Sequence, residues 1–188
     1  MRIIAGTARG RRLAAPKGMA TRPTPDRVRE ALFSILAPEI AAARVLDLYA
    51  GTGALGLEAL ARGAASATFV EKAPGTAALL RRNAELFAAG RARLLAMPVQ
   101  RALTLLAGEG AAFDLVFADP PYDAGLLPAT LDGLDRGGLV TPGGLVVCEH
   151  RPGKAPSATG AVSITDERAW GDVAVTIFTI APKGAAEP

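Results

Sequence analysis

The chain has 188 residues, of which half are apolar and 21% are charged, and its formal net charge is +3. This composition is typical of one globular domain and excludes a disordered chain. Apolar runs such as 115–118 and 145–148 are far too short to span a bilayer, so we expect a cytoplasmic protein with neither a leader nor a membrane anchor. One cysteine, Cys148, excludes an internal disulfide, and one histidine, His150, excludes a multi-histidine site, so no metal is expected.

The charge is unevenly distributed along the chain. Residues 1–29 contain eight basic residues and one acidic residue, which gives this segment a charge of +7, whereas the remainder carries −4. A basic segment on a nearly neutral body is typical of a protein that binds a polyanion. Most of these basic residues are arginines, which form bidentate contacts with phosphates and stack on bases. A high-GC genome explains the ratio of Arg to Lys, but it does not explain the clustering.

The predicted elements begin with a small hairpin that pairs residues 2–5 with 11–15 around Gly6 and Gly10. A helix then opens at Thr24 or Pro25 and stops at Pro38, because apolar residues recur between these points at helical spacing. Short apolar runs farther along predict strands at 44–49, 66–70, 92–96, 113–118 and 144–148. They alternate with helices predicted near 54–62, 74–89, 98–107 and 124–136.

Continuous apolar strands separated by helices indicate a parallel sheet that is covered on both faces. The last two strands, 161–167 and 172–180, are joined by too short a connection for a parallel crossover, so they must be antiparallel. The predicted fold is therefore a doubly wound, Rossmann-like α/β sheet that ends in an antiparallel hairpin. We divide the chain into a basic N-terminal arm (1–23) packed on the main domain (24–182), and a tail (183–188).

A glycine-rich turn follows the first strand of this sheet. Gly51, Gly53 and Gly56 form a G-x-G-x-x-G pattern between a strand and a helix, and Glu71 ends the next strand, twenty residues after Gly51. The glycines allow a tight turn and the close approach of a ligand, and the acid can bind ribose hydroxyls. We expect a cofactor to contact Ala50, Gly51, Thr52, Gly53, Gly56 and Glu71. Taken alone, the pattern fits NAD as well as it fits S-adenosylmethionine.

Asp47 lies four residues before the first glycine and distinguishes between these two cofactors. A carboxylate at this place would repel the pyrophosphate of a dinucleotide, which sits on the amides of the following helix. The same carboxylate would attract the cationic α-amino group of S-adenosylmethionine, so we favour that cofactor. The alternative is that Asp47 only caps the helix or braces the loop.

The tetrapeptide Asp119-Pro120-Pro121-Tyr122 comes after the fourth buried strand. Ligands bind beyond the carboxyl ends of the strands in such sheets, so we expect the tetrapeptide to face the same crevice as the glycine loop. The Asp119 carboxylate and the Pro120 carbonyl can accept both hydrogens of an exocyclic amine, and Tyr122 can stack on its ring. These acceptors would aim the lone pair of the amine at a sulfonium methyl group. The alternative is that the prolines end the strand and that Asp119 caps the next segment of the chain.

Together these motifs resemble the bacterial small-subunit rRNA guanine-N2 methyltransferases. The stretches that carry the resemblance are 7–13 with its Arg-Gly-Arg-Arg, 22–30 (Arg-Pro-Thr-Pro-Asp-Arg-Val-Arg-Glu), 47–63 and 119–122. The likeness covers about residues 1–150, and 22–30 is its discriminating part. It implies a seven-stranded class I methyltransferase fold and methyl transfer from S-adenosylmethionine to N2 of a guanine in 16S rRNA. The implied partner is this RNA or the assembling small ribosomal subunit, and we expect a monomer.

Carried over by position, the resemblance assigns roles to individual residues. Asp47, Gly51, Gly53 and Glu71 would hold the cofactor, and Asp119 to Tyr122 would be the catalytic residues that hold the guanine amine. Thr24 and Arg27 would lie near the methionine end of the cofactor or the RNA, and the predicted RNA contacts are Arg9, Arg11, Arg12, Arg22, Thr24 and Arg27.

One position departs from the pattern of the family. Pro98 stands where the family usually has an Asp or Asn that meets the adenine amino group. Adenine would then rely on the amide of Val99 and on apolar walls. A proline there also suits a first helical turn, so the predicted fold is unaffected.

Other functions remain open at this point. A DNA or other RNA amino-methyltransferase acting on adenine N6 would use the same tetrapeptide, although no separate target-recognition domain for DNA is evident. A methyltransferase for protein amides would leave the basic arm unexplained. An NAD-dependent oxidoreductase would share the glycine pattern, but Asp47 and the lack of an evident proton donor argue against it. A non-catalytic RNA-binding module would have little use for Asp119 beside a cofactor loop.

Overall fold

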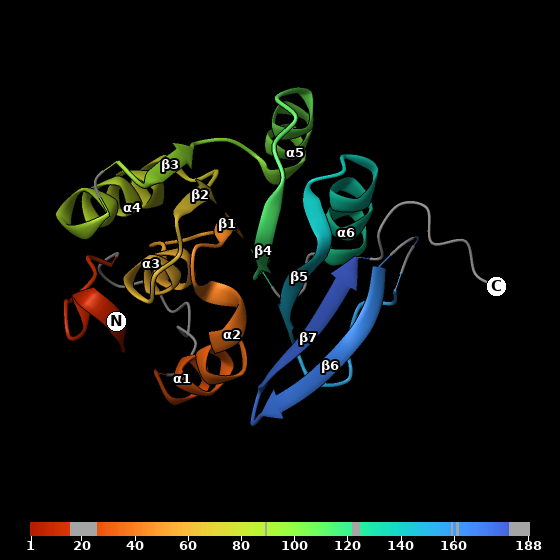
Figure 1. Cartoon of the computed structure of the whole chain (residues 1–188), viewed down its shortest axis with the longest axis horizontal. Helices are drawn as coiled ribbons and strands as arrows, with labels where there is room; N and C mark the ends of the chain where they lie inside the picture. The colour runs from red at the N-terminus through yellow and green to blue at the C-terminus, as the bar shows by residue number, and fades with distance from the viewer. Residues whose placement is uncertain (16–25, 89, 122–124, 159, 161, 181–188) are drawn as a thin grey trace.

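The computed structural model describes residues 1–15, 26–88, 90–121, 125–158, 160 and 162–180 (Figure 1). The strands are β1 (Arg44–Leu48), β2 (Ser66–Val70), β3 (Ala92–Leu95), β4 (Phe113–Ala118), β5 (Val140–His150), β6 (Val162–Trp170) and β7 (Val173–Ile180). The helices are the 3-10 turn η1 (Gly6–Ala8), α1 (Asp26–Ile35), α2 (Ala37–Ile40), α3 (Ala54–Ala61), α4 (Pro74–Phe87), α5 (Val99–Gly108) and α6 (Leu127–Arg136).

The seven strands form one sheet in the order β3-β2-β1-β4-β5-β7-β6. β1 to β5 are parallel where they pair, whereas β7 is antiparallel to both β5 and β6. The predicted α/β fold with a terminal antiparallel hairpin is therefore confirmed. The strand order reverses between β1 and β4, and ligands of open α/β sheets bind outside the carboxyl ends of strands at such a point.

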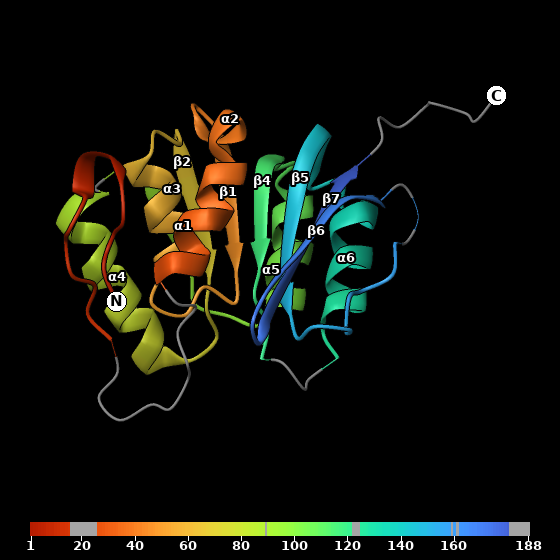
Figure 2. The ribbon, with the colours of Figure 1, turned by 90° about the horizontal axis from the view of Figure 1, so that it is seen from below.

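Two layers of helices cover the sheet, as Figure 2 shows, with α1 to α4 on one face and α5 and α6 on the other. Side chains alternate between the two faces along each strand. In β1, Val45 belongs to the core under α1 to α4, whereas Leu46 and Leu48 belong to the core under α5 and α6. This alternation between two buried layers explains why the strands read as continuous apolar runs.

Several element boundaries differ from the predicted ones, mostly by one or two residues, and those of β5, β6 and α1 have a clear physical reason. β5 begins at Val140 rather than 144, because Val140 already pairs with Phe113 of β4. The register of this pairing shifts before Leu145, and the glycines at 143–144 conceal the earlier part of the strand in the sequence. β6 runs on to Trp170, so the hairpin turn is confined to Gly171 and Asp172. α1 ends at Ile35, before Pro38, which lies in the first turn of α2, where a proline costs no hydrogen bond.

The N-terminal hairpin is less regular than predicted. A single antiparallel bridge, Arg2 with Arg12, replaces two paired strands, and η1 occupies the bend. Ile3, Ala8 and Leu13 are buried in the core under α1 to α4, and backbone hydrogen bonds join Ile3 to Gly10 and Arg11, and Met1 to Leu13, so side-chain packing and a short backbone pairing together hold this segment. The tail at 183–188 and the boundary at 23 lie outside the described residues, so the division into an arm, a main domain and a tail stays a prediction. Within the described residues no helix is long and apolar enough to cross a membrane.

Candidate active site

The carboxyl ends of the central strands gather the predicted acidic residues. Asp47 lies in β1 in register with Phe69 of β2 and Phe117 of β4. Glu71 and Asp119 each lie two residues after those phenylalanines. Asp47 likewise lies two residues after Val45, so by alternation all three carboxylates lie on the face of the sheet that α1 to α4 cover. The structure thus brings together acids that the sequence separates by more than 70 residues.

The glycines of the loop after β1 are required by backbone conformation and by packing. Gly51 and Gly53 have φ values of +55° and +85°, in the left-handed region that favours glycine. A Cβ on Gly53 would lie 2.2 Å from Cδ1 of Leu80, and one on Gly56 would lie 2.4 Å from the Phe69 ring. The loop is therefore a tight turn that does not tolerate side chains at these glycines. Gly51 and Thr52 remain partly exposed. Ala50 is buried, and its amide donates a hydrogen bond to the Val70 carbonyl.

Glu71 holds the glycine loop against the end of β2. Its Oε2 accepts a hydrogen bond from the Gly51 amide at 3.0 Å, and its Oε1 accepts one from the Ala73 amide at 2.7 Å. The side chain is only half-buried, so part of it remains accessible to solvent. The position fits an acid that binds ribose hydroxyls, and that role stays a prediction.

Asp47 is buried at 2% exposure, and its Oδ2 accepts a hydrogen bond from the Gly56 amide at 2.9 Å. Gly56 is the third residue of α3, so the carboxylate satisfies one of the free amides at the helix start. The bracing role that we considered for Asp47 is thus present. Burial and the nearby charge of Glu71 raise its pKa from 3.8 to about 7, against the opposing effect of the Gly56 hydrogen bond. A bound cation beside it would favour the ionised form.

This raised pKa predicts how the protein's stability depends on pH. Asp47 is neutral in the folded protein up to about pH 7, whereas in the unfolded chain it ionises near pH 4. The stability that it contributes is therefore complete below pH 4 and is lost as the pH rises through about 7. Asp47→Asn removes this buried charge, so at pH 8 we expect the cofactor-free variant to gain up to about 4 kcal/mol over the wild type, at about 1.4 kcal/mol per pKa unit.

Urea unfolding between pH 4 and pH 8 would measure this difference, which should vanish towards pH 4. Asp114→Asn is the matched control, because Arg44 lowers the pKa of Asp114 and that variant should instead lose stability at neutral pH. A gain for Asp47→Asn that is the same at both ends of the range would contradict the assignment.

Asp119 follows β4 directly and is half-buried, with Pro120 buried and Pro121 exposed behind it. Burial, then the charges of Glu149 and Asp47, raise the pKa of Asp119 well above its usual value. Tyr122 lies outside the described residues, so its stacking role stays a prediction. The tetrapeptide does end a strand, as the alternative required, but its carboxylate also lies close enough to Asp47 and Glu149 to feel their charges.

The predicted adenine contact lies at the start of α5. Val99 is the first residue of this helix and is buried, and Pro98 precedes it as the N-cap residue rather than standing in the first turn. The first amides of a helix have no partner within the helix. The Val99 amide is one of these first amides, and its contact with adenine stays a prediction.

The predicted RNA contacts that the structure describes lie mostly on the surface. Arg9, Arg12 and Arg27 are exposed, and Arg11 is exposed but donates a hydrogen bond to the Leu86 carbonyl at 3.0 Å. Arg22 and Thr24 lie outside the described residues. A pocket opens between the arm and α1, lined by Arg2, Ile3, Ile4, Ala5, Arg9, Gly10, Asp26 and Glu30.

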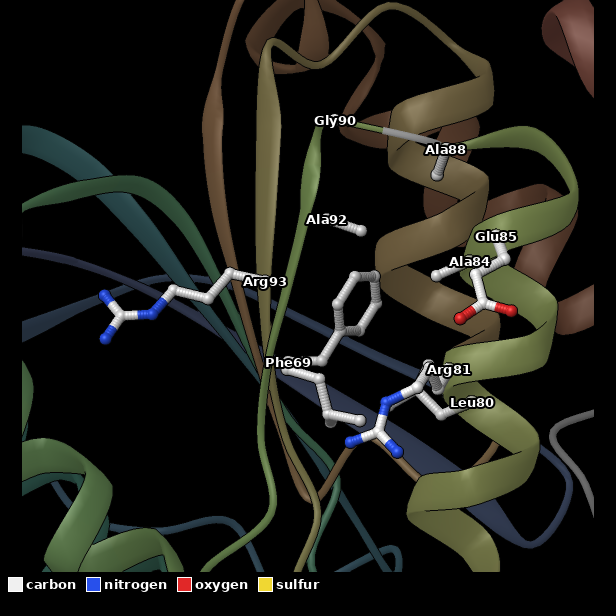
Figure 3. Close-up of a pocket in the computed structure, with 10 residues that line it drawn as sticks. Phe69, Leu80, Arg81, Ala84, Glu85, Ala88, Gly90, Ala92 and Arg93 are labelled. Carbon is white, nitrogen blue, oxygen red and sulfur yellow. The ribbon is translucent and has the colours of Figure 1, made fainter.

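Another groove lies between α4 and the edge strand β3 (Figure 3). Ala84, Ala88 and Ala92 line it beside Phe69, and the Arg93 side chain points away from it, towards Glu109. Phe69 and Leu80, which also line the groove, pack against the glycines of the loop from the side of α4 and β2, but no residue of the loop itself lines the groove. We assign it no part in the site. Within the described residues, no group of His, Cys, Asp and Glu is arranged to hold a metal ion.

A family model described as Conserved hypothetical protein 95 matches residues 1–179 of the chain. The chain belongs to this family. Over all 188 residues it is 38% identical to Ribosomal RNA small subunit methyltransferase D of Escherichia coli K12, of which it covers 93%. The solved structure of yhhF from E. coli is 40% identical, with a TM-score of 0.84 and coverage of 96% of this chain and 98% of that one. The hypothetical protein TTHA0928 of Thermus thermophilus is 36% identical, with a TM-score of 0.82 and coverage of 94% and 98%.

In this member of the Conserved hypothetical protein 95 family, the sequence did not indicate the positions of two residues in or next to the site. Glu149 in β5 is buried and follows Cys148, the register partner of Ala118, so it lies beside Asp119. Its signal was an acid at the end of an apolar strand. Tyr49 has a φ of +58°, which turns its side chain to the opposite face of the sheet, where its hydroxyl lies 2.7 Å from that of Thr130. No pattern in the sequence indicates a positive φ at Tyr49.

Proposed function

We propose that this chain transfers a methyl group from S-adenosylmethionine to the exocyclic N2 amine of a guanine in small-subunit ribosomal RNA. One observation carries the proposal. The glycine loop and Asp119 lie at the same end of the sheet, after the neighbouring strands β1 and β4, and the basic arm docks on the helix that leaves the loop. The E. coli relative bears the name of a small-subunit rRNA methyltransferase, which favours the same substrate. Such a substrate would place the protein in the cytoplasm; the monomeric state stays a prediction.

The residues at the carboxyl ends of β1 and β2 fit S-adenosylmethionine. Gly51 and Gly53 leave the loop without side chains at its tightest turns, and Glu71 stands at the end of the neighbouring strand with a partly open carboxylate. The buried Asp47 carboxyl, with its pKa of about 7, can supply the negative charge that a cationic amino group requires, because the bound cation favours its ionised form. When bound, the cofactor supplies an electrophilic methyl group on a sulfonium.

The chain's own contribution to the reaction is to hold the amine and to take its proton. Asp119 Oδ and the Pro120 carbonyl can accept the two amine hydrogens, which orients the nitrogen lone pair. The nitrogen becomes cationic as it gains the methyl group, so it must lose a proton. A carboxylate whose pKa is raised by burial, as at Asp119, is a stronger base than a free one and can accept that proton. Adenine N6 would satisfy the same acceptors; the family resemblance at residues 22–30 favours guanine.

Calorimetry tests the cofactor assignment. S-adenosylmethionine and S-adenosylhomocysteine should bind, whereas NAD and NADP should give no heat. Glu71→Ala should weaken binding by about 1–3 kcal/mol, because charge-assisted hydrogen bonds to ribose are lost. Glu85→Ala, an exposed acid on α4, is the matched control and should bind normally. Tight NAD binding would refute the proposed cofactor.

A further inference from the structure

A buried amide joins the N-terminal arm to the glycine loop. Asn83 of α4 has no exposed surface, and its side chain makes three hydrogen bonds. Its Oδ1 accepts from the Ala14 amide at 2.8 Å, and its Nδ2 donates to the Ala14 carbonyl at 3.1 Å. The second hydrogen of Nδ2 goes to the Thr52 carbonyl, between Gly51 and Gly53, at 3.0 Å. Both hydrogens of the amide are thereby used, one on the arm and one on the loop.

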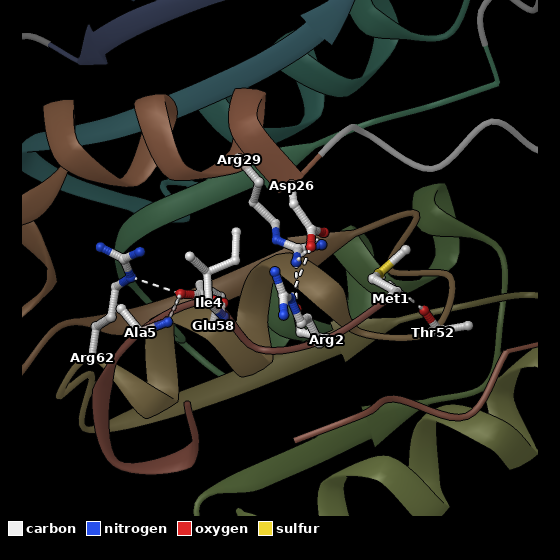
Figure 4. Close-up of polar contacts among 9 residues, drawn as sticks. All are labelled: Met1, Arg2, Ile4, Ala5, Asp26, Arg29, Thr52, Glu58 and Arg62. Atoms are coloured by element: carbon white, nitrogen blue, oxygen red, sulfur yellow. Dashed lines mark hydrogen bonds and ion pairs between the residues drawn. The ribbon is translucent and has the colours of Figure 1, made fainter. Parts of the chain in front are cut away.

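The arm is also fixed to α3, the helix that leaves the loop (Figure 4). Glu58 of α3 is fully buried, and its carboxylate accepts hydrogen bonds from the amides of Ile4 and Ala5 at 2.7 and 3.0 Å. Gly6 approaches the C-terminal end of α3 so closely that a Cβ there would lie 1.9 Å from the Ala61 carbonyl oxygen. These contacts hold residues 4–6 of the arm to α3, and Met1 adds one long contact to the loop, in which the Thr52 hydroxyl donates to its Sδ at 3.9 Å. Asn83 holds the last described part and the loop together.

We propose that Asn83 is a positioning residue that couples the arm to the cofactor loop, so that binding at either strengthens binding at the other. The RNA side of this coupling rests on the proposed function. The Thr52 carbonyl cannot move without straining the hydrogen bonds that fix Ala14, because one amide group makes all three. A cofactor that orders the loop therefore also orders the arm, so the arm loses less conformational entropy when it binds RNA. By reciprocity, RNA bound to the arm reduces the entropy that the loop loses when it binds the cofactor.

Amide hydrogen exchange followed by NMR tests the link without RNA. Addition of S-adenosylhomocysteine to the wild type should slow the exchange of the Ala14 amide by about tenfold. In Asn83→Ala the Ala14 amide should exchange rapidly with or without the ligand, whereas the Ile4 and Ala5 amides, held by Glu58, should keep their protection. Unchanged Ala14 exchange in the ligand-bound wild type would overturn the proposal, and so would an Asn83→Ala variant that still responds.

Calorimetry with and without a small-subunit RNA fragment tests the coupling itself. RNA should tighten the binding of S-adenosylhomocysteine by about fivefold or more in the wild type, at the lower end of usual coupling factors. Asn83→Ala should abolish that factor. Thr7→Val is the control, because it removes an arm contact to the Ala61 carbonyl away from the loop and should retain the factor.

The outcomes separate the two proposals. RNA that fails to bind would refute the proposed function, and the exchange experiment would still decide the link between arm and loop. RNA that binds without changing the affinity for S-adenosylhomocysteine would overturn the coupling alone. If Asn83→Ala fails to fold, the two wild-type measurements are sufficient to decide.

Discussion

Replacement of Asp119 by alanine should lower turnover by about 10²–10³-fold, on the scale of removing one oriented polar group from a reacting centre. The carboxylate lies beside Glu149 and directly follows β4. In the proposed reaction it holds an amine hydrogen and accepts the proton that the amine loses. Affinity for S-adenosylhomocysteine should barely change, since the proposal assigns Asp119 to the acceptor base. Because the pKa of Asp119 is raised, wild-type turnover should fall as the pH drops below that pKa.

Single-turnover kinetics and calorimetry on the same variant would separate the effect on chemistry from the effect on binding. Asp114→Ala is the matched control, because Asp114 belongs to the same strand at its other end, where it pairs with Arg44. That variant should keep its turnover. Near-normal turnover in Asp119→Ala would instead mean that the tetrapeptide is no more than the end of a strand.

Combined replacement of Arg9, Arg11 and Arg12 by alanine should flatten the dependence of RNA affinity on salt. Each phosphate contact releases counterions, at about 0.7–0.9 units of the log–log slope, so the slope should lose about 2–3 units. All three side chains are exposed. Arg11 also donates to Leu86, so its loss should lower the melting temperature slightly, whereas solvated arginines add little to folding.

Binding titrations at several salt concentrations would measure the slope. Arg101→Ala removes an exposed arginine from α5, on the other face of the sheet, and should leave the slope unchanged. A triple variant with the wild-type slope would show that these arginines serve solubility and not RNA. If the arm binds RNA as proposed, its contacts would also supply free energy towards the cost, a few kcal/mol, of turning a stacked guanine into the site.

The sequence was sufficient to predict the fold because the apolar runs and the turn residues between them indicate the same strands and helices along the central sheet. The apolar runs at 44–49 and 113–118 are buried on both faces, and the glycine pattern stands between a strand and a helix, so their placement followed from local rules. The irregular arm could not be predicted in the same way. Ile3 and Leu13 are buried by docking on distant helices, and the expected ladder is reduced to the bridge between Arg2 and Arg12.

The site could be predicted where an acidic residue stands at the end of a strand within a recognisable motif, as at Asp47 and Asp119. It was not predictable where the role comes from tertiary contact. Asn83 reads as an ordinary polar residue of a helix, and only the fold brings it between Ala14 and Thr52. Glu149 becomes a neighbour of Asp119 through the pairing of β4 with β5, which no local pattern reports.

The most direct test is to incubate the protein with S-adenosylmethionine that carries a tritiated methyl group and with small-subunit RNA from cells that lack the enzyme. Digestion of the RNA to nucleosides and mapping of the label would identify both the base and the atom. We predict label in N2-methylguanosine of the small-subunit RNA, and none with Asp119→Ala beyond its residual turnover. Label on adenine N6, on protein or on no acceptor at all would contradict the assignment.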